Sequence, residues 1–310
     1  MISSISIIPW SAKWVDIAWN GSIFCAIARN EWNPDRHVAI SNDGLTWQQG
    51  GELPALNGFW KALTYGNGVF CAIGETDGVF NVNIAATSPD GITWTQQSLP
   101  EAASWQAISW NGTVFCAIAD SKSYTITSPN GINWTKNTSF AFGLWRDIIW
   151  NGSIFCAIDY TNGITATSPD GVSWNTTGSH SPYSFTDISW NGTVFCAVGS
   201  TTCTSSDGLV WTRNLPPTTR TWTDISWNGT VFCATSNTRY VITSPDGIIW
   251  TEYTLPINTS IRSLTWNGTI FCGIMFDSDI AFTSPDGTFV DYELYYSFWT
   301  NFRGQAEILA

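Results

Sequence analysis

The sequence contains few charged residues and, in particular, few cations. Charged residues make up 12% of the 310 residues, and Asp and Glu outnumber Lys and Arg by 24 to 12, which gives a net charge of −12 at pH 7. Proteins bind the phosphates of nucleic acids and of anionic membranes chiefly through Lys and Arg. We therefore expect no nucleic-acid partner and no docking onto an anionic membrane.

Long apolar runs are also missing. None approaches the ~18 residues that a membrane-spanning helix requires, so we expect no membrane insertion. The first ten residues, MISSISIIPW, contain no cation, and their apolar stretch is short for a secretory signal. In contrast, 44% of the residues are hydrophobic and 15% are aromatic, including 20 Trp. A chain of this composition can bury a large core, which excludes intrinsic disorder.

The residues that common enzymes and cofactor sites require are scarce. Only two His are present, His37 and His180, and there is no glycine-rich phosphate loop and no C-x-x-C pair. We therefore expect no cofactor, no metal and no enzymatic activity. A glycosidase carboxylate pair is the enzymatic alternative that stays open, for instance among Glu75, Asp77, Asp277 and Asp279.

An internal repeat organises the chain. The string WNGTVFCAI recurs in seven copies at intervals of about 40 residues, each followed by a string close to TSPDGITWT and preceded by one close to W-x-D-I-x-W. The copies begin near residues 14, 60, 105, 145, 185, 222 and 261. Repeats of this length are typical of β-propeller blades and of solenoids.

Each copy predicts four antiparallel strands. The first segment alternates with a period of two, the second is short, β-branched and apolar, and Asn-Gly between them is a strong hairpin signal. Asp-Gly predicts the turn between the third and fourth strands. We therefore predict an all-β fold in which residues 1–310 form a single seven-bladed β-propeller with four antiparallel strands per blade and a ring closed by terminal strands. Residues 2–8 are expected to complete or abut the last blade, in competition with residues 288–294.

The S-x-D-G-x-x-W string resembles a shortened Asp box of the bacterial neuraminidase repeat. The full pattern is similar to propeller repeats of bacterial surface and phage tail-associated proteins, and it spans about 280 residues. In the resembled family the Asp box is a structural turn away from the ligand face. The resemblance thus implies structural turns, not catalytic carboxylates, at Asp43, Asp90, Asp170, Asp207, Asp246 and Asp286. Asn130 occupies the equivalent position in the third copy.

The loops between strands predict which end of the molecule binds a ligand. Asn-Gly and Asp-Gly turns share one end, because alternate turns of an antiparallel sheet lie together. The loops between second and third strands share the other end and vary between copies; they are residues 29–36, 75–83, 120–123, 160–162, 200–202, 236–239 and 277–279. A constant scaffold with variable loops is the usual arrangement of a binding face.

Candidate ligand contacts lie at this variable end. They are the aromatic residues that begin the first strands, one loop Trp and one loop Arg, namely Trp14, Trp32, Trp60, Trp105, Trp145, Phe185, Trp222 and Arg239. Packing between neighbouring blades is the alternative for the strand aromatics. Asp16, Asp147, Asp187 and Asp224, two residues further along, are expected to be buried polar anchors. Residues 291–310 form an aromatic tail in which Tyr295, Phe298 and Trp299 are candidates for partner docking, with packing as the alternative.

These features lead to a functional hypothesis. Seven Cys are equivalent, one per copy, and are expected to be free buried thiols, as is Cys203. Free thiols, N-x-S/T sequons in six of the Asn-Gly turns and the absence of a signal indicate synthesis in a bacterial cytoplasm. We expect a non-enzymatic binding protein for a glycan or surface receptor, located in a virion (phage tail or surface). The alternatives are a structural virion protein that contacts other virion proteins, and a location on the bacterial cell surface or in the cytoplasm.

Overall fold

The computed structural model describes residues 3–29, 36–177, 183–255 and 258–288. Their regular structure consists of β-strands. No helix in this part of the chain is long and apolar enough to cross a membrane.

Three of the sequence copies form separate four-stranded sheets, in which the strands follow chain order. The first copy forms β2 (Trp14–Trp19), β3 (Phe24–Ala28), β4 (His37–Ser41) and β5 (Gln48–Glu52). The fifth forms β17 (Phe185–Trp190), β18 (Phe195–Gly199), β19 (Thr202–Ser205) and β20 (Thr212–Asn214). The sixth forms β21 (Trp222–Trp227), β22 (Phe232–Ser236), β23 (Tyr240–Ser244) and β24 (Thr251–Thr254).

The N-terminal strand completes a fourth such sheet. β1 (Ser4–Ala12) pairs with β27 (Ser278–Ser284), which is followed by β26 (Phe271–Met275) and β25 (Ile261–Trp266). The expectation that the N-terminal segment completes the sheet of the last copy is confirmed. The competing segment, residues 288–294, lies outside the described residues except for Thr288.

The second, third and fourth copies share one eleven-stranded sheet. Its strands are β6 (Phe59–Gly66), β7 (Val69–Glu75), β8 (Val82–Ser88), β9 (Thr95–Trp110), β10 (Phe115–Lys122), β11 (Thr125–Ser128), β12 (Thr135–Asn137), β13 (Gly143–Trp150), β14 (Phe155–Asp159), β15 (Thr165–Ser168) and β16 (Asn175–Thr176).

The prediction of seven separate blades in a closed ring of four-stranded sheets is therefore wrong. The strands form four separate four-stranded blades and one larger sheet, and no sheet closes on itself. The physical reason is continuous hydrogen bonding. The 16-residue strand β9 pairs with β8 through its first part and with β10 through its second part, and β10 also pairs with β13 through Asp120 and Leu144.

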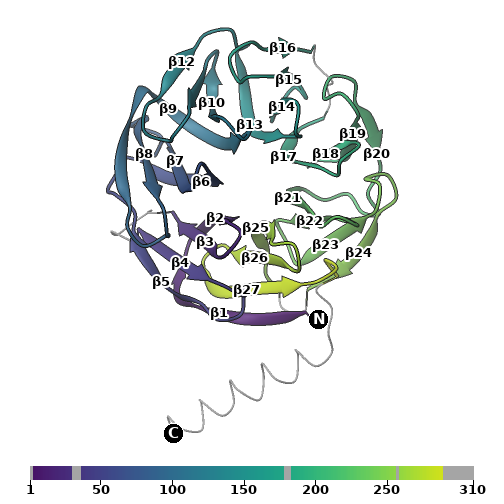
Figure 1. Ribbon diagram of the computed structural model, residues 1–310. Helices are drawn as coiled ribbons and strands as arrows, with labels where there is room; N and C mark the ends of the chain where they lie inside the picture. The colour runs from purple at the N-terminus through teal and green to yellow at the C-terminus, as the bar shows by residue number, and fades with distance from the viewer. Residues whose placement is uncertain (1–2, 30–35, 178–182, 256–257, 289–310) are drawn as a thin grey trace, which may run out of the picture.

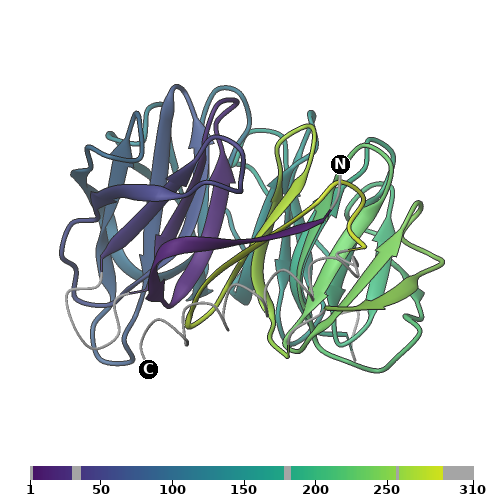
Figure 2. The ribbon, with the colours of Figure 1, turned by 90° about the horizontal axis from the view of Figure 1, so that it is seen from below.

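The sheets stand around a central axis, which gives the chain an all-β propeller fold (Figure 1). The first strand of each copy lies innermost, and β1, β5, β20 and β24 lie toward the rim. Viewed from the side, the strands run between two ends of the molecule (Figure 2). We call these the variable-loop end and the constant-turn end, after the loops defined from the sequence.

Each Asp-Gly turn packs on the copy before it. A Cβ at Gly171 would lie 3.1 Å from both Cys116 Sγ and Thr127 Cγ2 of the preceding copy. Gly44, in the first copy, packs in the same way on Cys272 and Thr283 of the last copy. All eight cysteines are free and buried, as the sequence predicted. Small side chains and glycine thus let neighbouring copies approach closely.

The carboxylate of each Asp-Gly turn holds the backbone of its own turn. Asp90 Oδ1 accepts hydrogen bonds from the backbone N of Ile92 and Thr93 at 2.8 Å, and Ser88 Oγ accepts from the backbone N of Gly91. The Trp94 Nε1 donates to the carbonyl oxygen of Gly91 at 3.2 Å. Equivalent bonds to backbone amides are made by Asp43, Asp170, Asp207, Asp246 and Asp286.

Candidate functional site

A one-residue bulge interrupts the inner strand of every copy near its start. In β2, Trp14 pairs with Ala28 and Asp16 with Ile27, so Val15 has no partner in the ladder. The same irregularity occurs in the other six inner strands. A bulge changes the direction in which neighbouring side chains point.

The bulges surround a cavity of about 210 Å³, which we call the axial cavity. Two consecutive residues of every inner strand line it. The bulged residues are Val15, Lys61, Gln106, Arg146, Thr186, Thr223 and Arg262. The residues that follow them are Asp16, Ala62, Ala107, Asp147, Asp187, Asp224 and Ser263. Because each inner strand starts at the variable-loop end, the bulged residues lie nearer to that end.

Three of the four aspartates of the axial cavity accept hydrogen bonds from the backbone of a neighbouring copy, whereas Oδ1 of the fourth, Asp224, is buried without a hydrogen-bond partner. Asp16 Oδ2 accepts a hydrogen bond from the backbone N of Leu63 at 2.6 Å, and Ser263 Oγ donates to Asp16 Oδ1 at 2.9 Å. The equivalent bonds run from the backbone N of Ile188 to Asp147 and from that of Ile225 to Asp187. These carboxyl groups act as the polar anchors that the sequence indicated.

The same carboxyl groups resist ionisation. Removal from bulk water raises the pKa of Asp16 to about 6, although hydrogen bonds from Leu63 and Ser263 oppose the effect. Desolvation and the nearby carboxylates raise the pKa of Asp187 and Asp224 well above the ordinary range. Desolvation also raises the pKa of Asp147. At neutral pH the four aspartates of the axial cavity thus carry less negative charge than the same number of fully ionised carboxyl groups would.

Three cations, Lys61, Arg146 and Arg262, line the axial cavity and lie nearer to the variable-loop end than the aspartates do. Lys61 contacts Glu75 at 3.4 Å, and Arg29, which lines a neighbouring cavity together with Arg262, contacts the same carboxylate at 2.8 Å. Arg146 donates to Gln106 Oε1 at 3.1 Å. Desolvation and the charge of Arg146 lower the pKa of Lys61 to about 8. The same two causes, in the same order, lower the pKa of Arg262.

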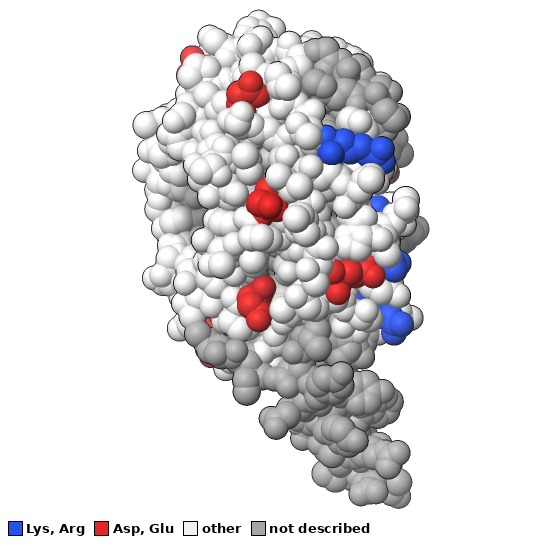
Figure 3. Space-filling model, turned by 90° about the vertical axis from the view of Figure 1, so that its right-hand side faces the viewer, with Lys and Arg blue, Asp and Glu red and all other residues white. Residues whose placement is uncertain are grey.

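Cations are concentrated at the variable-loop end of the described chain. In addition to the cavity residues, Lys13, Arg36, Lys122, Arg220 and Arg239 lie at the ends of strands or in loops there. The Asp-Gly turns place carboxylates at the opposite end. In the side view, the Lys and Arg residues lie along one edge, whereas a column of Asp and Glu residues runs down the middle (Figure 3). Most of the Lys and Arg residues that the structure describes therefore lie toward one end of a chain whose net charge is −12.

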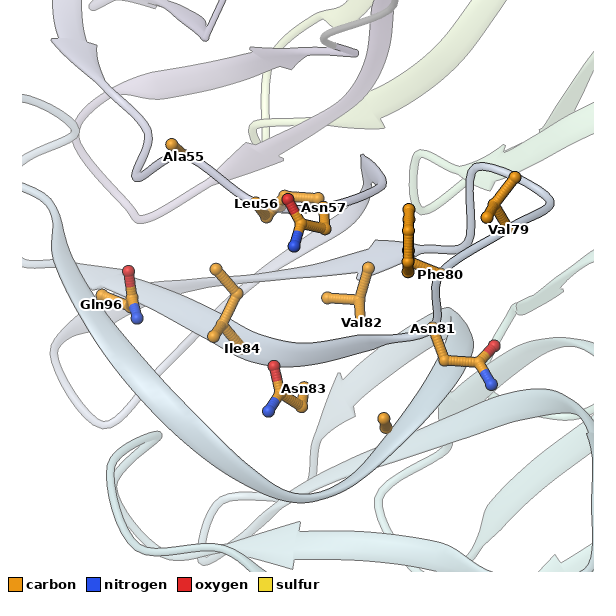
Figure 4. Close-up of a pocket in the computed structure, with 11 residues that line it drawn as sticks. Ala55, Leu56, Asn57, Val79, Phe80, Asn81, Val82, Asn83, Ile84 and Gln96 are labelled. Atoms are coloured by element: carbon orange, nitrogen blue, oxygen red, sulfur yellow. The ribbon is translucent and has the colours of Figure 1, made fainter.

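A second cavity, the rim cavity, lies at the edge of the second copy. It has a volume of about 420 Å³ and is lined by Leu56 and Asn57, by residues 79–84 and by Gln96 and Ala102 (Figure 4). Phe80 and Val79, in the loop between β7 and β8, are 57% and 77% exposed. Apolar side chains and side-chain amides thus line one concave surface at the variable-loop end.

The aromatic residues proposed as ligand contacts lie in the interior. The side chains of Trp14, Trp60, Trp105, Trp145, Phe185 and Trp222 are each at most 1% exposed. A side chain without accessible surface cannot stack on a ligand, so this burial favours the alternative of packing. Trp145, for example, packs on Phe140 with a ring distance of 4.4 Å.

The remaining candidates have different positions. Arg239 is exposed in the loop before β23, with its guanidinium 5.9 Å from the ring of Tyr240. Trp32, Tyr295, Phe298 and Trp299 lie outside the described residues. Among the possible glycosidase carboxylates, Glu75 is engaged by two cations and Asp77 accepts hydrogen bonds from its own loop.

The exposed aromatic residues and the axial cavity were not predicted from the sequence. Within the described residues, the exposed aromatic side chains are Phe80, Phe142 and Tyr160, and all three lie in loops at the variable-loop end. The bulged position was also missed. This position stands out when the seven copies are aligned, because Val15, Lys61 and their equivalents differ from copy to copy, whereas neighbouring positions are repeated.

Comparison with known proteins supports the fold alone. No protein-family model and no curated protein sequence matches the chain. Virginiamycin B lyase from Staphylococcus aureus has a similar structure, with a TM-score of 0.77, 11% identity, and coverage of 91% of this chain and 98% of that chain. YCF48 bound to D1 peptide has a TM-score of 0.69 and 14% identity, with coverage of 91% and 94%. YCF48 from Cyanidioschyzon merolae has a TM-score of 0.67 and 12% identity, with coverage of 90% and 98%. One of these names denotes an enzyme and another a peptide complex, so the shared property is the β-propeller fold.

Proposed function

We propose that the protein is a non-enzymatic recognition propeller that binds a receptor through its variable-loop end. The observation that carries this proposal is the position of Phe80, Phe142 and Tyr160, the exposed aromatic residues of the described chain, which all lie at that end. Aromatic side chains are enriched at binding interfaces, whereas the exposed large apolar side chains at the constant-turn end, such as Leu45, Ile92 and Ile248, are aliphatic. The rim cavity adds a concave apolar surface there.

The receptor is a protein or a glycan on a host surface, and a protein agrees better with the structure. Within the part of the chain that the structure describes, the burial of Trp14 and its equivalents leaves no ring of exposed aromatics on which sugars could stack. A propeller of similar fold, YCF48, has been seen with a bound peptide, which supports a polypeptide receptor by analogy. We place the protein on a phage tail or a bacterial surface, after synthesis in a bacterial cytoplasm.

Binding to host cells and to a glycan array, with the labelled full-length chain, tests the proposal. The double variant Phe80→Ser/Tyr160→Ser removes two exposed aromatics at the variable-loop end. We expect it to bind at least about tenfold more weakly, because such residues are typical interface hot spots. The matched control is Ile92→Ser/Ile248→Ser, which removes side chains of similar exposure, 53% and 52%, at the constant-turn end.

The comparison decides between the two ends of the molecule. If the control variant lost binding and Phe80→Ser/Tyr160→Ser kept it, the receptor would dock at the constant-turn end and the proposal would fail. Measurable turnover of an oligosaccharide panel by the wild-type chain would overturn its non-enzymatic part. All variants are first compared with the wild type by near-ultraviolet circular dichroism.

A further inference from the structure

The axial cavity contains cations whose charge is incompletely balanced. Among the described residues, neither Arg146 nor Arg262 forms an ion pair within 4.0 Å. Arg146 contacts Gln106, and the guanidinium of Arg262 lies 6.0 Å from the ring of Phe276. Lys61, whose side chain is only 11% exposed, shares the carboxylate of Glu75 with Arg29. Partly buried guanidinium groups without a close ion pair are less well compensated than paired ones, and an incoming anion would supply that pair.

The arrangement of these cations fits one compact anionic group. They come from the second, fourth and seventh copies, so they approach the axis from different sides. After desolvation, the charge of Arg146 is the next largest cause that lowers the pKa of both Lys61 and Arg262. A bound anion would relieve this repulsion. Arginine also suits a carboxylate geometrically, because its planar guanidinium can donate two parallel hydrogen bonds.

We infer that the axial cavity is a binding site for a carboxylate of a polypeptide, either an acidic side chain or a chain terminus. This inference rests on the proposed function and adds a specific contact to it. A volume of about 210 Å³ admits one such group and excludes a folded element. A polypeptide is favoured because the ring of Tyr160, which is 46% exposed, lies 5.7 Å from the guanidinium of Arg146 and would contact the residues that flank the acid.

The aspartates below the cations select against more highly charged ligands. Asp16, Asp147, Asp187 and Asp224 face the same cavity, and a dianionic phosphate would meet them at short range. Because burial raises the pKa of Asp187 and Asp224 well above the ordinary range, a ligand with a single negative charge meets less repulsion there than a dianion does. Lowering the pH should not weaken carboxylate binding until the ligand itself becomes protonated, since protonation of the aspartates only removes negative charge from the site.

The test measures binding of fluorescently labelled tetraglutamate to the full-length chain, with tetraglutamine amide as the uncharged probe. We expect saturable binding of tetraglutamate that weakens with salt, and at least tenfold weaker binding to Arg146→Gln/Arg262→Gln. The matched control is Arg36→Gln/Lys136→Gln, which removes two cations that already contact Glu52 and Glu101. The control should bind within twofold of the wild type.

Three results would overturn the inference. They are no saturable binding to the wild type, equal binding to Arg146→Gln/Arg262→Gln, and tighter binding of tetragalacturonate, which would make the ligand an acidic glycan. Receptor binding by the same variants separates this inference from the proposed function. If the receptor bound the wild type and Arg146→Gln/Arg262→Gln equally, the variable-loop end would still be the binding face, but the axial site would not take part.

Discussion

At the scale of single residues, glycine determines how closely neighbouring copies approach. Gly171 has a φ of +75° and lies against Cys116, whereas Gly192, in an Asn-Gly turn, has a φ of +97° and no heavy atom within 4 Å of a Cβ position. Both positions disfavour L side chains by ~1–2 kcal/mol. Gly171→Ala adds a steric conflict worth about 1–3 kcal/mol. We therefore expect Gly171→Ala to lower the free energy of unfolding more than Gly192→Ala does, as measured by urea denaturation. Equal losses would show that the interface between copies can adjust.

The aspartates of the axial cavity make stability depend on pH. The folded chain holds the Asp16 proton more tightly than the unfolded chain, since its pKa is about 6 against an ordinary 3.8. The free energy of unfolding should therefore fall as the pH rises from about 4 to 6, by roughly 3 kcal/mol for this group. Asp187, whose pKa is also raised, contributes with the same sign.

The variant Asp187→Asn tests this assignment, because an amide can still accept the hydrogen bond from Ile225 and cannot ionise. We expect it to be stabilised relative to the wild type, and more so at pH 8 than at pH 5. The control Asp207→Asn alters a turn carboxylate whose pKa is lowered by backbone hydrogen bonds from Val210 and Leu209. Its effect should be destabilising and constant between pH 5 and 8. A constant effect of Asp187→Asn would contradict the assignment.

At the scale of strands, β1 holds the first and last parts of the chain together. Ile8 is fully buried, whereas its neighbour Ile7, on the opposite face of the strand, is 56% exposed. Ile8→Ala should lower the free energy of unfolding by about 2–4 kcal/mol, because it leaves a cavity in the core. Ile7→Ala should change it by less than ~1 kcal/mol. Thermal and urea unfolding measure both, and similar losses would indicate that β1 does not pack as described.

Strands and turns could be predicted from the sequence, but sheet boundaries could not. Alternating residues and Asn-Gly or Asp-Gly turns depend on local conformational preferences. The continuity of β9 depends on partners far along the chain. Pro100 lies within β9, between the pairs Ile84–Ser98 and Val82–Ala103, in an irregular stretch of the ladder where its missing N–H costs little. The axial cavity was not predicted because it is formed by residues from all seven copies, which only the assembled fold brings together around one axis.

At the scale of the whole molecule, the cysteines report whether the sheets open together. Every copy contributes a buried thiol to its second strand, and burial raises the pKa of each; that of Cys203, on β19, rises to about 12. The first and last copies are joined by the hydrogen bond from Trp14 Nε1 to the carbonyl oxygen of Ser278 and by that from Ser263 to Asp16. We therefore expect that none of the eight thiols reacts with a disulfide reagent in the native protein at pH 8. In mild denaturant, all eight should react at one common rate, equal to the rate of global unfolding. Early reaction of one or two thiols, identified by mass spectrometry, would instead locate a copy that opens independently of its neighbours.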